Sequence, residues 1–550
     1  MRTEKVKTDV LVIGAGGAGL RAAIEARRRG ASVIMVSKTP AGTASCTAYA
    51  AGGFKAALDG PVELFKALKD PEEHFLETVS SGCYLNNQRL VEVLVKEAPA
   101  RLLELREYGV DVSVKKGGCW VTGSIPMFGT GLTNPLKEYA SKVGVKSLER
   151  TAIIDLLKTE DAIAGAIALD LSTSDLVVLE AKAVILATGG AGQIYARNDN
   201  PTRITGDGYA IAYRAGARLM DMEFVQFILG LAEPNLPSYA FSAYVGKLLN
   251  SSNEDPLKKY GLSWGREAQI YARDKLSWIL GLEIREGRGI DDALLLDLKD
   301  VPEDHWEKSS DPIVRTACWV LRGFDRRSRL IRIAPLTHFF MGGVGINERC
   351  ETSLSGLYAA GEVSGGLHGA NRVGGNALSE TIVFGVRAGE NAATYSSQRE
   401  HAPTDWDSVR TIEKQIKQIL SKKRYPLKPR AVKDSIGTIM WQHGSVVRDA
   451  QGLQAGFDQL GKLQEEAIRR IVATNPTELM EAFEALNMLA VGEMVLRAAL
   501  NRSESRGAHY RIDHPNQDNE RWLKNNYIFK SQERMCLEAL PVIARLEPRS

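Results

Sequence analysis

Short apolar runs alternate along the chain with longer stretches in which apolar residues recur about every 3.6 positions. The run Val10–Ile13 predicts a buried strand, and the alanine-rich stretch after it, up to Gly30, predicts a helix. A second apolar run, Ala31–Ser37, predicts the next strand. Strand, helix and strand in this order are typical of a parallel α/β unit.

The same two patterns, helical spacing and short β-like runs, divide the rest of the chain into segments. Helical spacing predominates in residues 61–110, and β-like runs fill residues 150–187. Residues 222–330 have less glycine and more aromatic and charged positions, and glycine-rich short strands return at residues 331–397. Helical periods then continue from a polar linker to about residue 530. These shifts predict domain boundaries near residues 222, 330 and 400.

A glycine pattern joins the first strand to the first helix. Gly14 permits a tight turn, Gly16 lets the backbone approach a pyrophosphate, and Gly19 lets the helix pack close to the strand. A plain glycine-rich turn is the alternative, but the strand–turn–helix context favours a dinucleotide. The second strand ends in Ser37 and Lys38, where an NAD-binding fold usually has an acidic residue. This difference speaks against NAD, although the serine hydroxyl can still bond a ribose.

Composition narrows the classes of partner. The 550 residues carry a net charge of +3 with both signs interspersed, which indicates neither nucleic acid nor an anionic membrane as a partner. The six cysteines are far apart, so we expect no metal or iron–sulfur cluster in this chain and a reducing compartment. From its first residues and its apolar runs we expect neither a signal peptide nor a membrane-spanning segment. We expect a cytoplasmic protein without direct membrane insertion, which could be peripheral to a membrane through a partner.

Several motifs occur together in the order of one known family. On GAGGAGL, SCTAYAAGG, ATGG, MEFVQF, GLYAAGE, GLHGANRVGGNALSE and ESRGAHYR, the chain resembles the flavoprotein subunit of succinate dehydrogenase and fumarate reductase. Relatives are L-aspartate oxidase and the alpha subunit of adenylylsulfate reductase. The resemblance implies an α/β fold with a split Rossmann-like FAD-binding domain (1–221 and 331–397), an inserted α+β capping domain (222–330) and a C-terminal helical domain (398–550).

The resemblance also implies where FAD binds. The helix that begins at Asn376 is expected to point its N-terminus at the flavin C2 carbonyl, where its dipole favours the anionic reduced flavin. The positions implied are Gly14, Gly16, Gly17, Ala18 and Gly19 at the pyrophosphate, Ser37 and Lys38 at the adenosine ribose, Ser45, Cys46, Thr47, Gly52 and Gly53 toward the flavin, Ala187, Thr188, Gly189 and Asp207 at a second nucleotide-contacting stretch, Gly361 and Glu362 at the ribityl chain, and Arg372, Asn376, Ala377 and Leu378 beside the flavin.

Cys46 bears on how FAD is attached. In family members with covalent flavin, a histidine at this position of an SHT-type motif forms the bond, so we predict non-covalent FAD here. A cysteinyl link is the minority alternative. Loss of the histidyl bond should lower the flavin potential, which suits reduction or a low-potential donor better than oxidation of succinate by quinone.

Three catalytic positions are implied in the same way. His338 and Arg372 match residues that bind one carboxylate of fumarate, and Arg273 matches the proton donor. The plainer alternatives are a core histidine, a buried ion pair and a surface pair with Asp274. The sequence departs from the family after MEFVQF, where Ile228 replaces the histidine that binds the second carboxylate, and the following Thr, Glu and Arg of the family motif are absent.

The departure at Ile228 shapes the functional expectation. An apolar side chain there would leave a second carboxylate unpaired, at a cost on the order of several kcal/mol. We therefore expect hydride transfer between flavin N5 and a C–C double bond of a small monocarboxylate or enoyl-type substrate, with electrons exchanged with an iron–sulfur subunit. The alternatives are a fumarate reductase or succinate dehydrogenase proper, sulfur chemistry like that of adenylylsulfate reductase, and a non-catalytic FAD electron-transfer subunit.

Overall fold

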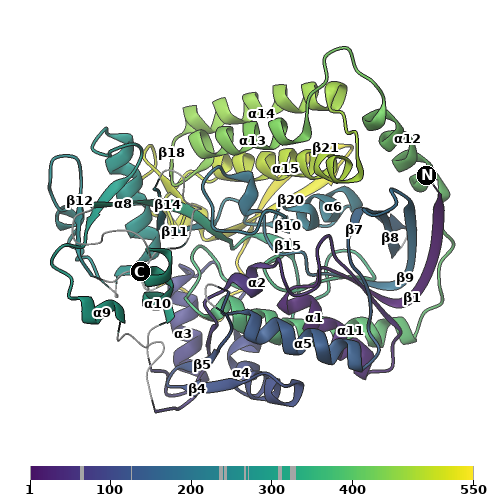
Figure 1. Ribbon diagram of the computed structural model, residues 1–550, viewed down its shortest axis with the longest axis horizontal. Helices are drawn as coiled ribbons and strands as arrows, with labels where there is room; N and C mark the ends of the chain where they lie inside the picture. Colours follow the sequence, from purple (N-terminus) through teal and green to yellow (C-terminus); the bar gives the residue numbers. More distant parts are fainter. Residues whose placement is uncertain are drawn as a thin grey trace.

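The computed structural model describes most of the chain. It covers residues 2–61, 67–124, 127–160, 162–233, 240, 245–265, 268–269, 272–307, 312–321 and 330–548. An α/β region, an inserted region and a layer of long helices make up the molecule, and Figure 1 shows them at the lower right, at the left and along the top.

A mostly parallel sheet forms the centre of the α/β region. Across the sheet the strands are β6 (Lys146–Leu148), β2 (Val33–Val36), β1 (Thr3–Ile13), β9 (Leu176–Leu186), β8 (Ile163–Asp170) and β7 (Thr151–Lys158). The first four run parallel, and β8 and β7 are antiparallel. The second half of β9 also pairs in parallel with β16 (Leu357–Ala359). The chain thus returns to its first sheet after the insertion, which confirms the split α/β fold.

Helices cover this sheet, with a small second sheet beside them. They are α1 (Gly17–Arg28), α2 (Cys46–Tyr49), α3 (Pro71–Ser81), α4 (Gln88–Glu104), η1 (Leu105–Tyr108), α5 (Thr130–Lys142), η2 (Gly192–Ile194), α6 (Asp207–Ala215) and α11 (Asn376–Ser397), and the small sheet is β3 (Gly53–Lys55), β5 (Gly118–Val121) and β4 (Val112–Lys115). Helices α1 and α11 touch backbone to backbone: a Cβ on Gly389 would lie 2.3 Å from the Ala22 carbonyl oxygen. This close packing locks the two halves of the domain together.

The inserted region has a sheet and an apolar core of its own. Its elements are β11 (Val225–Leu231), β14 (Leu330–Phe340), β13 (Leu294–Asp297) and β12 (Lys247–Leu249), with η3 (Lys258–Tyr260), α8 (Arg273–Arg285), α9 (Glu303–Glu307) and α10 (Pro312–Val320). Leu280, Leu296 and Ile333 are fully buried in this separate core. The predicted boundary near residue 330 coincides with the start of β14, but this strand pairs with β11 and β13. The inserted sheet therefore continues to Phe340.

Four long helices form the layer at the top of Figure 1: α12 (Trp406–Leu420), α13 (Pro429–Gly444), α14 (Ala450–Arg470) and α15 (Pro476–Asn501). Helix α15 has buried residues on nearly every face, as expected of a helix enclosed by others. It packs between α13 and α14 on one side and α6 of the α/β region on the other. The C-terminal helices thus lie directly over the first half of the cofactor domain.

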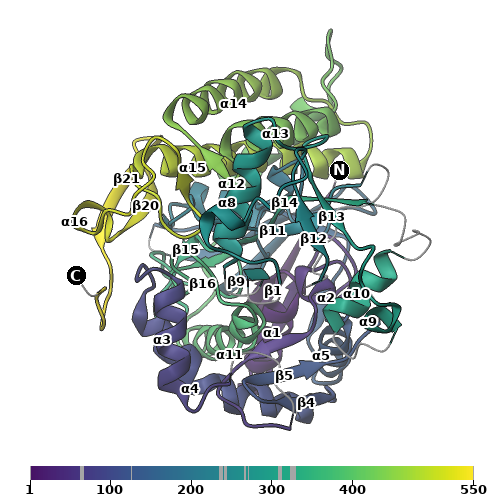
Figure 2. The ribbon, with the colours of Figure 1, turned by 90° about the vertical axis from the view of Figure 1, so that its left-hand side faces the viewer.

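The chain ends in strands rather than helices. After β18 (Val447–Arg448), β19 (Tyr510–Arg511) and α16 (Asn519–Trp522) come β20 (Lys524–Ser531) and β21 (Arg534–Pro541), a hairpin that Figure 2 shows at the left edge. β20 pairs with β10 (Leu219–Met220), which pairs with β15 (Gly343–Gly345) and through it β17 (Ser364–Gly365). The helical expectation to about residue 530 was wrong for this stretch. Gln532 and Glu533 turn with φ of 47° and 62°, without the Asn-Gly signal that usually marks such turns.

The described residues contain no helix that is both long enough and apolar enough to cross a bilayer.

Candidate functional site

The glycine loop after β1 is shaped for close approach of a ligand. Gly14 has a φ of 113°, and a Cβ there would lie 2.1 Å from the Ala187 carbonyl oxygen. A Cβ on Gly19 would lie 1.9 Å from the Gly14 carbonyl oxygen, so neither position tolerates a side chain. Helix α1 begins after Gly16 with no side-chain cap and no acidic residue in its first turn. Its N-terminus, at Gly17 and the following residues, therefore offers a positive dipole to a pyrophosphate.

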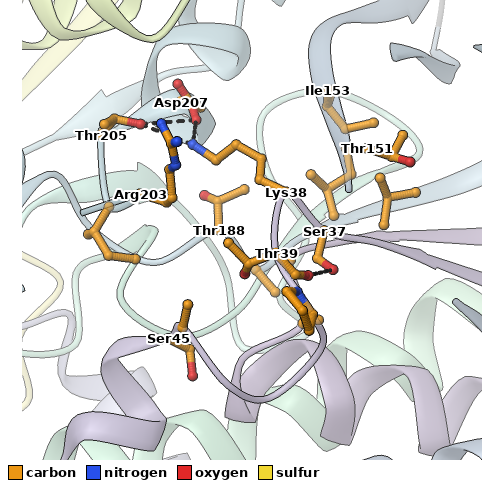
Figure 3. Close-up of a pocket in the computed structure, with 18 of the residues that line it drawn as sticks. Ser37, Lys38, Thr39, Ser45, Thr151, Ile153, Thr188, Arg203, Thr205 and Asp207 are labelled. Carbon is orange, nitrogen blue, oxygen red and sulfur yellow. Dashed lines mark hydrogen bonds and ion pairs between the residues drawn. The ribbon is translucent and has the colours of Figure 1, made fainter. Parts of the chain in front are cut away.

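A pocket opens beside this loop, at the carboxyl ends of β1, β2 and β9, where parallel α/β sheets bind ligands (Figure 3). Ser37, Ser45 and Thr188 line it from three separate segments. The Thr188 hydroxyl is buried and has no hydrogen-bond partner among the described residues. The Ser37 hydroxyl donates to the Thr39 carbonyl oxygen at 2.6 Å, which leaves its oxygen free to accept. The Thr188 hydroxyl, without a partner in the described part of the chain, and the close-approaching glycine loop fit the AMP half of a dinucleotide.

Lys38 forms one wall of this pocket and is held by carboxylates. Its Nζ lies 2.6 Å from Asp207, at the start of α6, and 2.7 Å from Glu484, in α15 (Figure 3 shows the first of these contacts). Burial disfavours the charged amine, but the two carboxylates more than offset this and raise the pKa of Lys38. Glu484 also contacts Lys433 and Arg203 at 2.7 and 3.2 Å. Burial raises the pKa of Glu484, but the charges of Lys38, Lys433 and Arg203 outweigh this and lower it to about 2.

The second half of the domain contributes a buried carboxylate. The Phe340 amide donates to Glu362 Oε1 at 3.0 Å, and burial raises the pKa of Glu362 to about 7. Gly190, just after Gly189 (φ 76°), makes room for it, since a Cβ there would lie 2.1 Å from Oε1. Next to Glu362, Gly361 approaches α1, where its Cβ would lie 2.9 Å from that of Ala18. A carboxylate so close to the glycine loop is available to hydroxyl donors of a ligand.

Helix α11 points an uncapped N-terminus into the same region. It begins after Gly375 (φ 86°) with Asn376, Ala377 and Leu378 in its first turn and no side-chain cap. Instead of capping its own helix, Asn376 donates to the Thr78 hydroxyl at 3.0 Å and its Oδ1 lies 2.8 Å from His74 Nε2. Burial lowers the pKa of His74 to about 4, so a neutral ring donates to Asn376. His74 and Thr78 of α3, which hydrogen-bond Asn376, were not predicted by any sequence motif.

Cys46 lies at the start of α2. Ser45 caps this short helix by accepting from the Ala48 amide at 3.2 Å, and the Thr47 hydroxyl accepts from the Gly17 amide at 3.2 Å. Burial, with Glu362 and Asp199 nearby, raises the pKa of the Cys46 thiol well above its ordinary value. A protonated thiol is a poor nucleophile.

The backbone beyond this helix is also tightly placed. Gly52 has a φ of 85°, and a Cβ on it would lie 2.6 Å from the Val121 carbonyl oxygen. Gly53 follows as the first residue of β3 and pairs with Trp120.

His338 owes its position to an irregularity in β14. Gln226 of β11 pairs with Phe339 and Phe227 pairs with Thr337, so His338 is the extra residue of a β-bulge. Bulges commonly redirect a side chain next to an active site. The His338 Nδ1 lies 2.8 Å from an Asp199 carboxylate oxygen. Neither the bulge nor Asp199 was predicted, because both depend on the pairing of distant segments.

Arg372 and Arg273 form an electropositive pair. Arg372 is 6% exposed, its guanidinium lies over the Phe339 ring at 4.5 Å, and its Nε has no hydrogen-bond partner among the described residues. Burial and then the charge of Arg273 lower the pKa of Arg372 to about 9. Arg273 begins α8 and its Nε donates to the Gln269 carbonyl oxygen at 3.0 Å. Two neighbouring cations with an orphaned N–H group form a site for an anion.

Ile228 lies on the strand that faces this pair. It pairs with Leu336 and shares a sheet face with Gln226, two residues earlier. The Gln226 amide donates to the Arg372 carbonyl oxygen and to Asn371, both at 2.9 Å. The half-buried Ile228 therefore lies on the side of β11 that approaches Arg372. The residues that follow Glu233, where the family motif would continue, lie largely outside the described residues.

Comparisons with known proteins agree with this geometry. Residues 9–378 match the family described as FAD binding domain, and residues 433–549 match fumarate reductase flavoprotein C-term. An uncharacterised FAD-dependent oxidoreductase of Methanocaldococcus jannaschii is 37% identical over 96% of this chain and 97% of its own length. One chain of the fumarate reductase (CoM/CoB) of Methanothermobacter marburgensis is 36% identical over 94% of this chain and 96% of its own length.

A solved structure shows the same fold. The flavoprotein of E. coli quinol fumarate reductase superposes with a TM-score of 0.89 at 29% identity, over 100% of this chain and 99% of that one. FAD as the cofactor and the resemblance drawn from the motifs are thereby confirmed. The chain belongs to the FAD-dependent oxidoreductases of the fumarate reductase and succinate dehydrogenase flavoprotein type.

Proposed function

We propose that this oxidoreductase reduces the C–C double bond of a substrate with one carboxylate or one conjugated carbonyl, such as an enoate or an enoyl thioester. FAD supplies hydride chemistry when bound. Arg372 and His338 bind the carboxylate or carbonyl, and Arg273 stands where a proton can reach the neighbouring carbon. These roles rest on the family resemblance and on the positions of the three side chains.

The observation that carries the proposal is Ile228. Cationic groups gather at one end of the site, where Arg372 has an orphaned N–H and Arg273 lies near it. Strand β11 carries the apolar side chain of Ile228 on the same face as Gln226. A second carboxylate placed against Ile228 would lose its hydration without a partner, at a cost on the order of several kcal/mol. An apolar substituent would lose nothing there.

A substrate panel tests this proposal. The purified protein is reduced anaerobically with a low-potential dye, and reoxidation is followed with crotonate, a crotonyl thioester and fumarate. We expect kcat/KM for the monocarboxylate or thioester to exceed that for fumarate at least tenfold. Turnover of fumarate as the best substrate would contradict the proposal and identify an ordinary fumarate reductase.

An exchange at Ile228 sharpens the test. Ile228→His restores a side chain that can bind a second carboxylate, so we expect fumarate turnover to rise about tenfold or more and turnover of the apolar substrate to fall. Ile228→Leu is the matched control, because it keeps the site apolar and should retain the wild-type order of substrates. Equal effects of the two replacements would show that position 228 does not select the substrate.

We also propose that a separate iron–sulfur protein exchanges electrons with this chain and that any contact with a membrane is made through such a partner. The cysteines are dispersed and free, and among the described residues no group of His, Cys, Asp and Glu is arranged to hold a metal. In the assay above, the dye takes the place of this partner.

A further inference from the structure

Asp199 connects His338 to a second polar side chain. Its Oδ2 lies 2.8 Å from His338 Nδ1, and its Oδ1 accepts from the Asn200 side-chain amide at 3.0 Å. The carboxylate is 12% exposed and the imidazole 29%. An ionised carboxylate can only accept hydrogen bonds, so Nδ1 carries a proton and Nε2 is the free edge of the ring.

The backbone fixes this pair on both sides of the bulge. Thr337 donates its amide to the Arg197 carbonyl oxygen at 3.0 Å and accepts from the Asp199 amide at 3.3 Å. Asn200 donates its side-chain amide to the His338 carbonyl oxygen at 3.1 Å. The segment 197–200 thus runs beside β14 and holds the imidazole and the carboxylate in one orientation.

Asn200 is itself oriented by its neighbours. Its Oδ1 lies 3.7 Å from the Cys46 thiol sulfur, which donates to it, while Nδ2 serves Asp199 and His338. Gly192 leaves room for the amide, since a Cβ there would lie 2.5 Å from Asn200 Oδ1. With both ends of the amide in use, Asp199 Oδ1 always faces a donor. Its Oδ2 is therefore the oxygen left for the histidine.

We propose that Asp199 is a positioning residue for the reaction: it balances the charge of a doubly protonated His338, whose Nε2–H then donates to the carbonyl oxygen of the substrate. Addition of hydride to the β-carbon moves the electron pair of the double bond onto this oxygen as an enolate. A proton then goes to the α-carbon from the side of Arg273, and the carbonyl is restored. The two electrons come from the iron–sulfur donor. This inference rests on the proposed function, because a site with one anchored end must stabilise the developing charge at that end.

Asp199→Asn provides a defined test. Asn200 still donates toward the same oxygen, so the amide that replaces the carboxylate turns its NH₂ group toward His338, and Nδ1 must then accept. The ring stays neutral with its proton on Nε2, as in the corresponding replacement in serine-protease triads. A neutral donor is weaker than a charged one. With a crotonyl thioester we expect kcat to fall tenfold to a hundredfold and KM to change less than about threefold, since the charge exists only in the transition state.

Two measurements separate this role from a structural one. Nitrogen NMR of histidine-labelled protein, with the His338 signals assigned by their loss in His338→Gln, should show both ring nitrogens protonated in the wild type and only Nε2 protonated in Asp199→Asn. Asp199→Asn should also cost little in the His338→Gln background. Asp292→Asn is the charge control, because this aspartate is 75% exposed and lies 3.7 Å from Arg197 of the same segment. It should leave kcat and the NMR signals unchanged.

Failure of this inference can be told from failure of the proposed function. If Asp199→Asn keeps Nδ1 protonated, or lowers kcat equally with and without His338, Asp199 does not act through the histidine. If fumarate is the best substrate but Nδ1 follows Asp199 as expected, only the proposed substrate class is wrong. Should Asp199→Asn not retain FAD, Asp199→Ser removes the same charge with a smaller side chain, and the loss of kcat with and without His338 then decides.

Discussion

At the scale of single residues, some functional positions could be predicted from the sequence, and others could not because their partners lie far away along the chain. Gly14 and Gly19 could be predicted because they stand at the spacing of a known strand–turn–helix motif. At Gly19 the steric requirement is also local, since a Cβ there would meet the Gly14 carbonyl oxygen, whereas a Cβ on Gly14 would meet the distant Ala187. Glu484 and Asp199 could not be predicted, since each meets its partner across a separation of more than a hundred residues. Sequence spacing contains no information about such pairs, and neither residue lies in one of the family motifs.

Cys46 carries the first prediction at this scale. Burial raises the pKa of its thiol, which favours the protonated form, so we expect no bond between this sulfur and the flavin ring. Acid precipitation of the purified holoprotein should leave the yellow colour in the supernatant, and Cys46→Ser should bind FAD with similar stoichiometry. Colour that stays with the wild-type pellet and leaves the Cys46→Ser pellet would instead establish a cysteinyl bond.

At the scale of elements, strand and helix types were predictable wherever one period ran for many residues. The first strand–helix–strand unit and the helical layer belong to this group. The bulge in β14 was not predictable, because it exists only relative to the register of β11. The C-terminal hairpin was missed because its turn, at Gln532 and Glu533, has neither glycine nor asparagine to mark it. Errors therefore fall where pairing, rather than local pattern, decides the structure.

The loop between β1 and α1 yields a prediction at this scale. A Cβ added at Gly14 would meet the backbone carbonyl of Ala187 at 2.1 Å, and the residue has a φ of 113°. Gly14→Ala must therefore separate β1 from the stretch after β9 and should abolish or strongly weaken FAD binding, measured by absorbance of the purified protein. Gly30→Ala is the matched control: Gly30 has a φ of 89° but open space around it, so strain without a clash should leave FAD content unchanged.

At the scale of the whole molecule, a buried ionic cluster ties the C-terminal helices to the cofactor domain. Glu484 is 2% exposed and contacts Lys38, Lys433 and Arg203. Removal of one partner from a buried ion pair typically costs about 3–5 kcal/mol, because the remaining charges are left without compensation. The cluster therefore makes the orientation of a pocket-lining lysine depend on a helix more than 400 residues away in sequence.

Glu484→Gln should lower the free energy of unfolding by about 3 kcal/mol at pH 7. The pKa of Glu484 is about 2 in the folded protein, below its value in an unfolded chain, so its contribution is present above pH 4.5 and is lost as the pH falls toward 2. The difference between wild type and variant should shrink by about 1.4 kcal/mol per pH unit below pH 4.5, measured by urea unfolding.

Glu481→Gln is the control for this prediction. Glu481 contacts Arg203 at 3.2 Å from a more exposed position, so its loss should cost less than about 1 kcal/mol. A difference that stays constant down to pH 3 would mean that Glu484 does not act through its charge.

The return of β16 to the edge of β9 has a consequence for biosynthesis. The ribosome completes the glycine loop within the first twenty residues, but Glu362 and the N-terminus of α11 emerge more than 300 residues later. Until then β9 lacks the partner that pairs with its second half, and the nascent chain has only one wall of the cofactor site. FAD capture must therefore come late in translation or after it. A truncated chain that ends before β16 should be made without the flavin.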